Sequence, residues 1–340
     1  MKELGFAIIG SGMIARYHAT AIADTPGARL VAMAVSRPER VAQAQADFGV
    51  PAFSDLNDLL KQPDVDVVCI ATPSGLHKEQ GVAAARAGKH ILVEKPIALS
   101  LEDADELIGA CKSNGVKMAS ALQRRTDPNF AEVRAAIEAG ELGRLVMGNL
   151  VMPYMRTQAY YDSAAWRGTW ALDGGGALMN QGIHLVDLLV WFMGDVAEVY
   201  AHAATLTHQI EVEDNVTASL RFKNGALGSI LATTSATPGF PHRVEVYGDV
   251  AGVQLEGENV MRWEGSKPRV APASEKADAG AAASPTGIST AGHTRLIGDL
   301  VDAIHNDRTP MISGEEGRRA LSLILAVYES ARTGRPVTPR

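Results

Sequence analysis

Cysteine is one of the scarcest residues in this chain of 340 residues, which contains only Cys69 and Cys111. Both lie within apolar or helical patterns, and neither has a partner at the spacing of metal ligands. We therefore predict no metal site and two buried thiols, which are typical of a protein in a reducing compartment.

Clusters of basic residues and long apolar runs are also missing. The net charge is −7, so a nucleic-acid partner would lack its electrostatic footprint. No run reaches the ~20 apolar residues of a membrane span, and residues 1–10 lack the charged and apolar regions of a signal peptide. We expect a cytoplasmic protein without a nucleic-acid or membrane partner.

The first third of the chain alternates short apolar runs with helical patterns. The runs, which predict strands, are 6–9, 30–35, 65–70, 90–93 and 117–120. The stretches between them predict helices over 13–24, 38–48, 56–61, 77–87 and 101–113. Strands that are short, almost wholly apolar and separated by helices form a parallel sheet covered on both faces. We predict an α/β Rossmann domain, doubly wound, over residues 1–122.

Residues 123–340 have a different pattern, and a chain of this length is expected to form two domains. Helices are predicted over 129–139, 177–193, 294–305 and 315–333, and alternating strands over 196–207, 214–223, 226–234, 243–247 and 250–255. This pattern favours an α+β domain with a large open, mostly antiparallel sheet. The segment 266–292 is rich in Ala, Ser, Pro, Gly and Lys, which predicts a long loop near the site or a poorly ordered excursion.

A glycine-rich turn at residues 10–15 follows the first strand and precedes the first helix. It fits the pattern G-x-G-x-x-[GA]. Gly10 and Gly12 allow a tight turn and close approach to a pyrophosphate, whose charge the helix start at Met13 and Ile14 stabilises. The alternative is a turn that binds nothing. The context favours a dinucleotide site.

The end of the second predicted strand bears on the choice of cofactor. An acidic residue there typically binds the ribose hydroxyls of NAD, but this chain has Ser36 and Arg37. Both side chains can bind the 2′-phosphate of NADP. Arg37 could instead belong to a solvated helix start in an NAD enzyme. We expect NAD(P), and NADP in preference to NAD.

Two further motifs follow strands whose carboxyl ends share one edge of the predicted sheet, where ligands bind in such folds. Thr72 and Pro73 would form the floor beneath the nicotinamide, and His77 follows as either a contact or a solvent-facing residue. Lys95, within Glu94-Lys95-Pro96, could have a pKa lowered by desolvation, or it could stay charged and stabilise an alkoxide. A surface lysine is the alternative.

A polar stripe crosses the apolar helix predicted over 177–193. Asn180, His184 and Asp187 are spaced by four and three residues, so they share one face. A histidine such as His184 is suited to proton transfer, Asn180 can orient a hydroxyl, and Asp187 can fix the histidine tautomer or cap backbone. A satisfied core histidine is the alternative, and the presence of Lys95 disfavours it.

With these motifs the chain resembles the Gfo/Idh/MocA family, the glucose-fructose oxidoreductase and inositol dehydrogenase group, over essentially its whole length. The resemblance is carried by residues 10–15, 71–73 with His77, 94–96, 174–184 with Asp187, and 334–336. It implies a Rossmann domain followed by an α/β domain whose open sheet often forms the interface of a homodimer or homotetramer.

The family's usual helix motif is Asp-x-x-x-His, whereas this chain has Asn180. Asparagine cannot exchange a proton, so acid–base work would fall to His184 and Lys95. Together with residues 160–162 and 166–170, Asn180 makes the chain similar to the branch that contains UDP-N-acetyl-2-amino-2-deoxyglucuronate dehydrogenase.

The resemblance also suggests roles for residues outside these motifs. Trp166 and Arg167 would close over the cofactor, and Tyr160 and His293 would border the substrate. Gln123, Arg124 and Arg125 would meet the nicotinamide amide or an anionic substrate. The alternatives are surface or interdomain charges at Arg124 and Arg125, plain packing at Trp166, and a surface histidine at position 293.

The expected function is hydride transfer between NAD(P) and a secondary hydroxyl of a sugar, sugar nucleotide or cyclitol. Lys95 and His184 would share proton transfer and oxyanion stabilisation, in either order. An NAD-dependent glycosidase of the same fold is the main alternative. A non-catalytic sugar sensor is disfavoured, because such relatives tend to lack the Lys and His pair.

Overall fold

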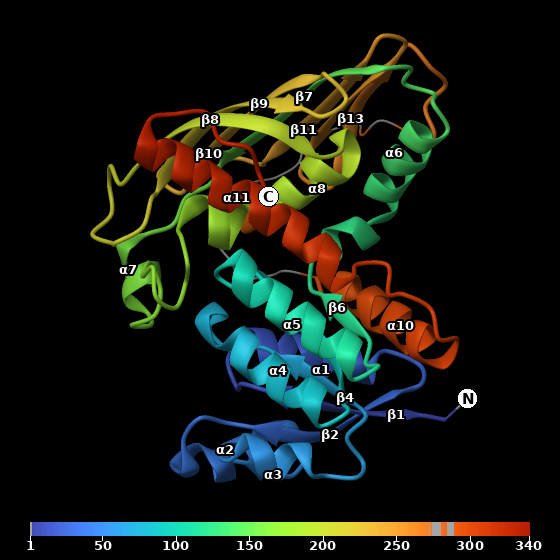
Figure 1. Cartoon of the computed structure of the whole chain (residues 1–340), viewed down its shortest axis with the longest axis vertical. Helices are drawn as coiled ribbons and strands as arrows, with labels where there is room; N and C mark the ends of the chain where they lie inside the picture. The colour runs from blue at the N-terminus through green and yellow to red at the C-terminus, as the bar shows by residue number, and fades with distance from the viewer. Residues whose placement is uncertain (1, 272, 274–279, 284–288) are drawn as a thin grey trace. The chain divides into compact units, whose positions relative to one another are not determined.

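A computed structural model describes residues 2–271, 273, 280–283 and 289–340 (Figure 1). The chain forms two compact units. The first comprises Met1–Gln123 and Ser289–Arg318, and the second comprises Arg124–Ile288 and Arg319–Arg340. The division predicted at residues 122 and 123 differs from these units in the segment Ser289–Arg318. This segment joins the first unit because α10 (Ala291–His305) packs on α1 and β2.

The first unit contains a six-stranded parallel sheet with the strand order β3-β2-β1-β4-β5-β6. Its strands are β1 (Leu4–Ile9), β2 (Ala28–Ala34), β3 (Ala52–Phe53), β4 (Val67–Ile70), β5 (His90–Val93) and β6 (Met118–Ser120). The predicted Rossmann fold is confirmed. The strand order reverses between β1 and β4, and the glycine-rich turn follows β1 at this switch point.

Helices connect the strands of the first unit. They are α1 (Met13–Ala23), α2 (Val41–Phe48), α3 (Leu56–Leu60), α4 (His77–Arg86) and α5 (Leu101–Ser113). Ser100 caps α5, because its hydroxyl accepts a hydrogen bond from the Asp103 amide at 3.0 Å. Cys69 and Cys111 are buried free thiols, as predicted.

The second unit contains a seven-stranded sheet in the order β13-β12-β11-β7-β10-β9-β8. The strands are β7 (Leu145–Pro153), β8 (Val196–Ala204), β9 (Asn215–Phe222), β10 (Leu227–Thr233), β11 (Arg243–Gly248), β12 (Gly252–Glu256) and β13 (Asn259–Glu264). Only β7 and β10 pair in parallel, so the prediction of a mostly antiparallel sheet is confirmed. The prediction omitted β7, which lies at the centre of the sheet, and β13, which lies at its edge.

Helices cover one face of this sheet, where α8 (Ile183–Met193) packs on β7 and β11 and α6 (Pro128–Glu138) packs on α8 (Figure 1). The predicted helix over 177–193 is divided, because residues 177–182 form a π-helix before α8. The remaining helices are α7 (Gln158–Asp162), α9 (Gly280–Ala283) and α11 (Gly314–Thr333).

Two sequence predictions concern loops and membranes. Within the predicted loop 266–292, residues 272, 274–279 and 284–288 lie outside the described residues, and 280–283 are helical. Among the described helices, none combines the length and the apolar character that crossing a bilayer requires.

Candidate active site

The glycine-rich turn has the geometry of a dinucleotide cradle. Gly10 has a φ of +113°, and a Cβ there would lie 2.5 Å from the carbonyl oxygen of Ala71, so only glycine fits this turn. Gly12 is different, because a Cβ there would meet nothing within 4 Å and would project into open space. Helix α1 starts at Met13 without a side-chain cap or an acidic residue in its first turn. Its positive end is therefore available to a phosphate.

Ser36 and Arg37 follow β2 and are exposed. Across the described residues, the Arg37 side chain makes no hydrogen bond or ion pair, unlike the guanidinium of Arg16, which bonds Asp47 at 2.6 Å. The charge of Arg37 is thus available to a ligand at this edge of the sheet.

His77 is the first residue of α4, and its buried ring contacts the backbone of two loops. One ring nitrogen lies 2.7 Å from the carbonyl oxygen of Pro96, and the other lies 3.0 Å from that of Thr72. The alternative of a solvent-facing His77 is wrong, since 1% of the residue is exposed. Burial lowers the pKa of His77, while the two carbonyl contacts oppose that shift. The Thr72 hydroxyl donates to Gln80 at 2.7 Å.

Lys95 lies directly after β5 and is half-buried, and its peptide bond to Pro96 is cis. Its backbone amide donates to Oε2 of Glu94 at 3.3 Å. The Glu94 carboxylate is itself buried against two histidines of the same unit. His18 Nε2 lies 2.8 Å from Glu94 Oε1, and His293 Nε2 lies 3.6 Å from it. These contacts anchor the turn that carries Lys95.

The charge of Glu94 follows from these neighbours. Burial alone would raise its pKa, but the hydrogen bond to His18 and the charges of His18 and His293 hold the pKa well below its usual range. His293 is 2% exposed, so the alternative of a surface histidine is wrong. His18, Glu94 and His293 each offer one atom that could bind a metal ion, and these three atoms lie within 4.8 Å of one another. However, His18 Nε2 and Glu94 Oε1 are 2.8 Å apart, which is a hydrogen-bond distance and is shorter than the roughly 3.3 Å that separates two ligands of one tetrahedral zinc ion.

The polar stripe of the second unit spans the junction of the π-helix and α8. Asn180 donates through Nδ2 to the buried carboxylate of Asp173, and its Oδ1 accepts from Gln181 at 3.2 Å. His184 lies in the first turn of α8 and is half-buried. Asp173 therefore fixes the orientation of the Asn180 amide, a role that the sequence did not reveal.

Asp187 and Arg125 form a buried ion pair. The Arg125 guanidinium donates to both carboxylate oxygens of Asp187, at 2.8 and 2.6 Å. Arg125 is 3% exposed, so the structure contradicts the expectation that it meets the cofactor or an anionic substrate. The predicted roles of Asp187 were to fix the histidine tautomer or to cap backbone, and the Arg125 guanidinium is one of its partners. Arg124 forms an ion pair with Glu258 at 2.5 Å, and Gln123 lies against Gly292.

Glu213 is a second buried carboxylate that the sequence analysis missed. It accepts hydrogen bonds from the amides of Gly176 at 2.9 Å and Leu178 at 2.8 Å, and from the Tyr328 hydroxyl at 2.9 Å. These bonds hold the start of the π-helix that carries Asn180. Burial raises the pKa of Glu213 to about 7, against the effect of its hydrogen bonds.

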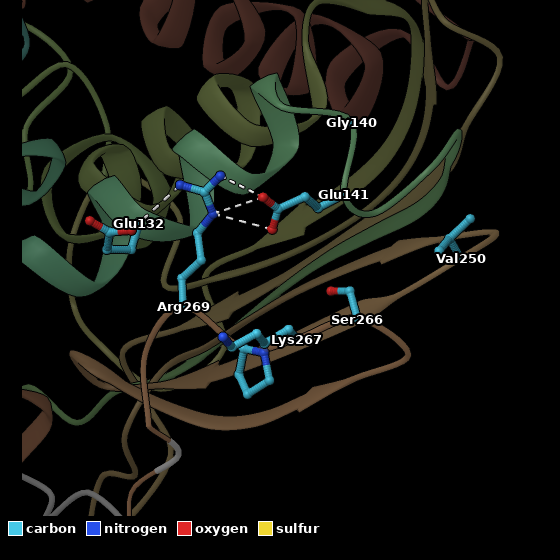
Figure 2. A pocket seen from close by; sticks show the side chains of 8 residues that line it. Glu132, Gly140, Glu141, Val250, Ser266, Lys267 and Arg269 are labelled. Atoms are coloured by element: carbon cyan, nitrogen blue, oxygen red, sulfur yellow. Dashed lines mark hydrogen bonds and ion pairs between the residues drawn. The ribbon is translucent and has the colours of Figure 1, made fainter.

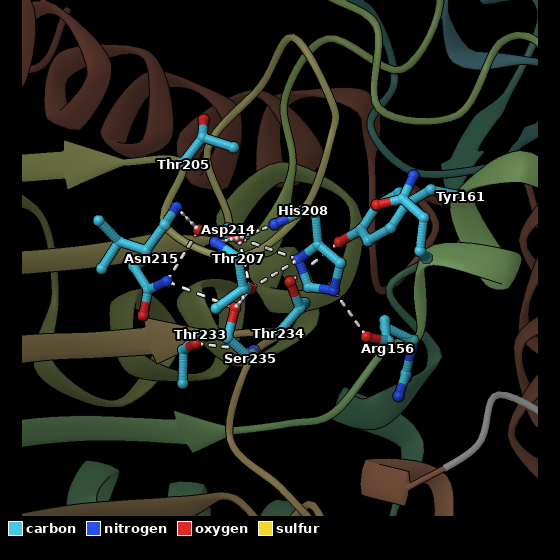
Figure 3. A network of polar contacts seen from close by, with 12 residues as sticks. Arg156, Tyr161, Thr205, Thr207, His208, Asp214, Asn215, Thr233, Thr234 and Ser235 are labelled. Atoms are coloured by element: carbon cyan, nitrogen blue, oxygen red, sulfur yellow. Dashed lines mark hydrogen bonds and ion pairs between the residues drawn. The ribbon is translucent and has the colours of Figure 1, made fainter.

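In the second unit, the guanidinium of Arg167 packs against the rings of both Tyr160 and Trp166. The guanidinium carbon of Arg167 lies 4.3 Å from the centre of the Tyr160 ring and 4.6 Å from that of Trp166. Figure 3 shows an adjoining network in which His208 bridges the Asp214 carboxylate, at 2.9 Å, and the carbonyl oxygen of Arg156, at 2.8 Å. The backbone that carries Arg156 is thereby fixed.

A cavity of about 760 Å³ lies elsewhere in the second unit. Figure 2 shows Arg269 between Glu132 and Glu141 at its wall. None of the predicted site residues lines this cavity, so we do not assign it to the chemistry.

Comparison with known proteins gives consistent matches over both units. Residues 4–122 match the oxidoreductase family with an NAD-binding Rossmann fold, and residues 130–254 match the GFO/IDH/MocA C-terminal domain. The WlbA dehydrogenase from Bordetella pertussis, solved with NADH and UDP-GlcNAcA, is 35% identical, with a TM-score of 0.89 and 99% of each chain covered.

Two curated relatives are also similar over most of their length. Myo-inositol 2-dehydrogenase of Thermotoga maritima is 29% identical, with 97% of each chain covered. The 1,5-anhydro-D-fructose reductase of Ensifer adhaerens is 31% identical, with 97% of this chain and 96% of the relative covered.

Proposed function

Because the chain belongs to the GFO/IDH/MocA family of NAD-binding oxidoreductases, we propose that it oxidises a secondary hydroxyl of a sugar, sugar nucleotide or cyclitol, reversibly. The observation that carries this proposal is Lys95, which is held at the carboxyl end of β5 by Glu94 in the unit that contains the glycine-rich turn. The names of the similar dehydrogenases and reductases support the same class of substrate.

The residues present fit a bound dinucleotide. Gly10 and Gly12 would hold the pyrophosphate beside the start of α1, and Thr72 and Pro73 would border the nicotinamide. When bound, NAD(P) supplies the hydride acceptor. We assign to Ser36 and Arg37 a preference for NADP, since neither is acidic and the Arg37 charge has no counterion within the described part of the chain.

In the proposed chemistry the substrate hydroxyl loses a proton as its carbon loses a hydride. Lys95 and His184 perform proton transfer and oxyanion stabilisation, in either order. Asn180, held by Asp173, orients the substrate without exchanging a proton.

We also propose a sugar-nucleotide substrate, a cytoplasmic location without nucleic-acid or membrane partners, and a homodimer or homotetramer. The similarity to the WlbA dehydrogenase supports the substrate. Large apolar side chains on the helix-free face of the sheet support the assembly, since Met147, Leu227 and Leu231 are 44, 56 and 45% exposed.

A substrate panel tests the reaction. Purified protein is given NAD or NADP with UDP-sugars, inositols or free aldoses, and nicotinamide absorbance is followed. Reduction of NAD or NADP is expected with a substrate from one of these classes. Cleavage of a nitrophenyl glycoside by protein that retains its cofactor, without net reduction of that cofactor, would instead identify a glycosidase.

The NADP preference has its own test. Arg37→Ala is expected to lower the ratio of kcat/KM for NADP to that for NAD by about tenfold, the loss of one charge-assisted contact. Arg40→Ala, at another exposed arginine three residues later, is the control and should leave the ratio unchanged. If the two variants had the same ratio of kcat/KM for NADP to that for NAD, the assignment of Arg37 to the cofactor site would be wrong.

A further inference from the structure

The π-helical turn Ala177–Gly182, which carries Asn180, is capped by two residues from distant parts of the chain. The first N–H groups of a helix have no acceptor within it. Here the acceptors are both carboxylate oxygens and the carbonyl oxygen of Glu213, and the hydroxyl of Tyr328. They accept from the amides of Gly176 at 2.9 Å, Leu178 at 2.8 Å, Ala177 at 2.9 Å and Met179 at 3.1 Å, respectively. We refer to Glu213 and Tyr328 as the Glu213–Tyr328 cap.

Two glycines before the turn make room for this cap. A Cβ at Gly176 would lie 1.8 Å from the carbonyl oxygen of Glu213, and one at Gly175 would lie 2.3 Å from the Tyr328 hydroxyl oxygen. A side chain at either position would push a capping group away from the start of the helix. Gly175 and Gly176 are therefore accounted for by the close approach of the cap.

Glu213 is suited to this position as a carboxylate. It is 4% exposed, and besides the two amides it accepts from the Tyr328 hydroxyl at 2.9 Å. A negative charge at a helix start is favoured by the helix dipole. All three groups around the carboxylate are donors, so a protonated carboxyl would direct its own O–H toward a donor. The ionised form fits this geometry.

The hydrogen-bond register of the turn decides where Asn180 lies relative to α8. A π-helix pairs residue i with residue i+5, is rare and often occurs at functional sites. A return to α-helical pairing would remove one residue from the turn and rotate Asn180 by about 100° relative to α8, at 3.6 residues per turn. Such a rotation would break the hydrogen bond from Asn180 to Asp173. A turn that is rarely adopted needs contacts from outside the helix, and the cap supplies them.

We infer that Glu213 is a positioning residue of the proposed reaction: together with Tyr328, it holds the π-helical turn in the register that places Asn180 for contact with the substrate hydroxyl. This inference rests on the proposed function, because Asn180 is the residue that we assign to substrate orientation. Glu213 acts through Asn180 and not by contact with the substrate.

Hydrogen–deuterium exchange of residues 174–184 tests the hold on the turn without requiring turnover. In Glu213→Gln one oxygen becomes an NH₂ group that cannot accept from a backbone amide, so exchange of this segment is expected to be faster than in the wild type. Glu211→Gln is the matched control, because this exposed carboxylate also accepts from a backbone amide, that of Trp170 at 3.0 Å. Equal exchange in the wild type and Glu213→Gln would overturn the inference.

Kinetics at about pH 8, above the Glu213 pKa of about 7, test the positioning role. Turnover is normalised to folded protein, so that a loss of stability alone leaves kcat unchanged. We expect kcat of Glu213→Gln to fall by about 10- to 100-fold, the scale for a misplacement of about 1 Å, while the KM for the cofactor is retained. A wild-type kcat in folded Glu213→Gln would contradict the positioning role.

A double-mutant cycle identifies the residue through which Glu213 acts. In an Asn180→Ala background, Glu213→Gln is expected to lower kcat by no more than about threefold, because the contribution of Asn180 is already lost. An undiminished loss in that background would show that Glu213 does not act through Asn180, and the inference would be wrong.

Tyr328→Phe provides a second variant, which keeps the carboxylate. It should accelerate exchange of residues 174–184 and lower kcat, each by less than Glu213→Gln does. If Glu213→Gln does not fold, wild-type exchange and kcat in Tyr328→Phe would overturn the inference. If the wild type turns over no substrate of the panel while exchange responds as expected, the proposed reaction is rejected and the hold on the turn stands.

Discussion

Glu94 and Glu213 are both buried carboxylates, one in each unit, and their pKa values are shifted in opposite directions. The pKa of Glu94 lies well below its usual range, whereas burial raises that of Glu213 to about 7. Both are almost completely buried, at 7 and 4% exposed. Burial therefore cannot account for the difference.

The difference lies in the groups that donate to each carboxylate. Glu94 faces the imidazoles of His18 and His293, whose charges lower its pKa, while burial lowers the pKa of His18 against the effect of Glu94. Glu213 faces two backbone amides and the Tyr328 hydroxyl, which remain neutral donors. Neutral hydrogen bonds offset part of the desolvation of a carboxylate, and nearby cations offset more. Each carboxylate also holds the backbone close to a residue that we assign to the chemistry.

The largest effect is expected from removing the charge of Glu94. Glu94→Gln leaves His18 and His293 without their counterion, and breaking such a buried pair costs about 3–5 kcal/mol. The midpoint of urea unfolding should fall accordingly. Glu79→Gln, at an exposed glutamate of the same unit, is the matched control. Equal midpoints for both variants would show that the histidines are neutral and that the contrast with Glu213 is absent.

Ionisation of Glu213 should lower the stability of the fold, whereas ionisation of Glu94 should raise it. Its folded-state pKa of about 7 exceeds the unfolded value, so the folded state favours the protonated form. Glu213 thus destabilises the fold as pH rises from about 4.5 to about 7, by about 3 kcal/mol at roughly 1.4 kcal/mol per pKa unit. In Glu213→Gln the free energy of unfolding should not show this decrease between about pH 4.5 and about pH 7. A wild-type slope in the variant would assign the titration to another group.

A smaller change sharpens the comparison by removing one neutral donor. Tyr328→Phe deletes the hydroxyl that donates to Glu213 and accepts from the Met179 amide. We expect a loss of about 1–2 kcal/mol and a further rise in the pKa of Glu213. Carbon-13 NMR of labelled glutamate carboxyls would report that pKa. A lower value would mean that Tyr328 does not stabilise the ionised form.

The first unit was predictable from the sequence because its signals are local. Each apolar run became a buried strand, and the glycine-rich turn lies where a strand is followed by a helix. The central strand β7 was missed, since its residues lie within a long segment rich in tyrosine, tryptophan and glycine, to which we assigned no strand. The partners of Glu94, Asp187 and Glu213 were missed for another reason. They lie 35 to 199 positions away in the chain, as for Glu213 with Leu178 and Glu94 with His293, and no local pattern encodes such pairs.

Lys95→Ala tests the central claim, that this lysine takes part in hydride transfer from a sugar-type hydroxyl. Turnover would be followed by nicotinamide absorbance with the best substrate of the panel, and cofactor affinity by fluorescence titration. The account predicts that kcat falls by about 10²-fold or more, the usual scale for one acid–base or oxyanion group, while cofactor affinity is largely retained. Near-normal turnover in this variant, with cofactor bound, would contradict it.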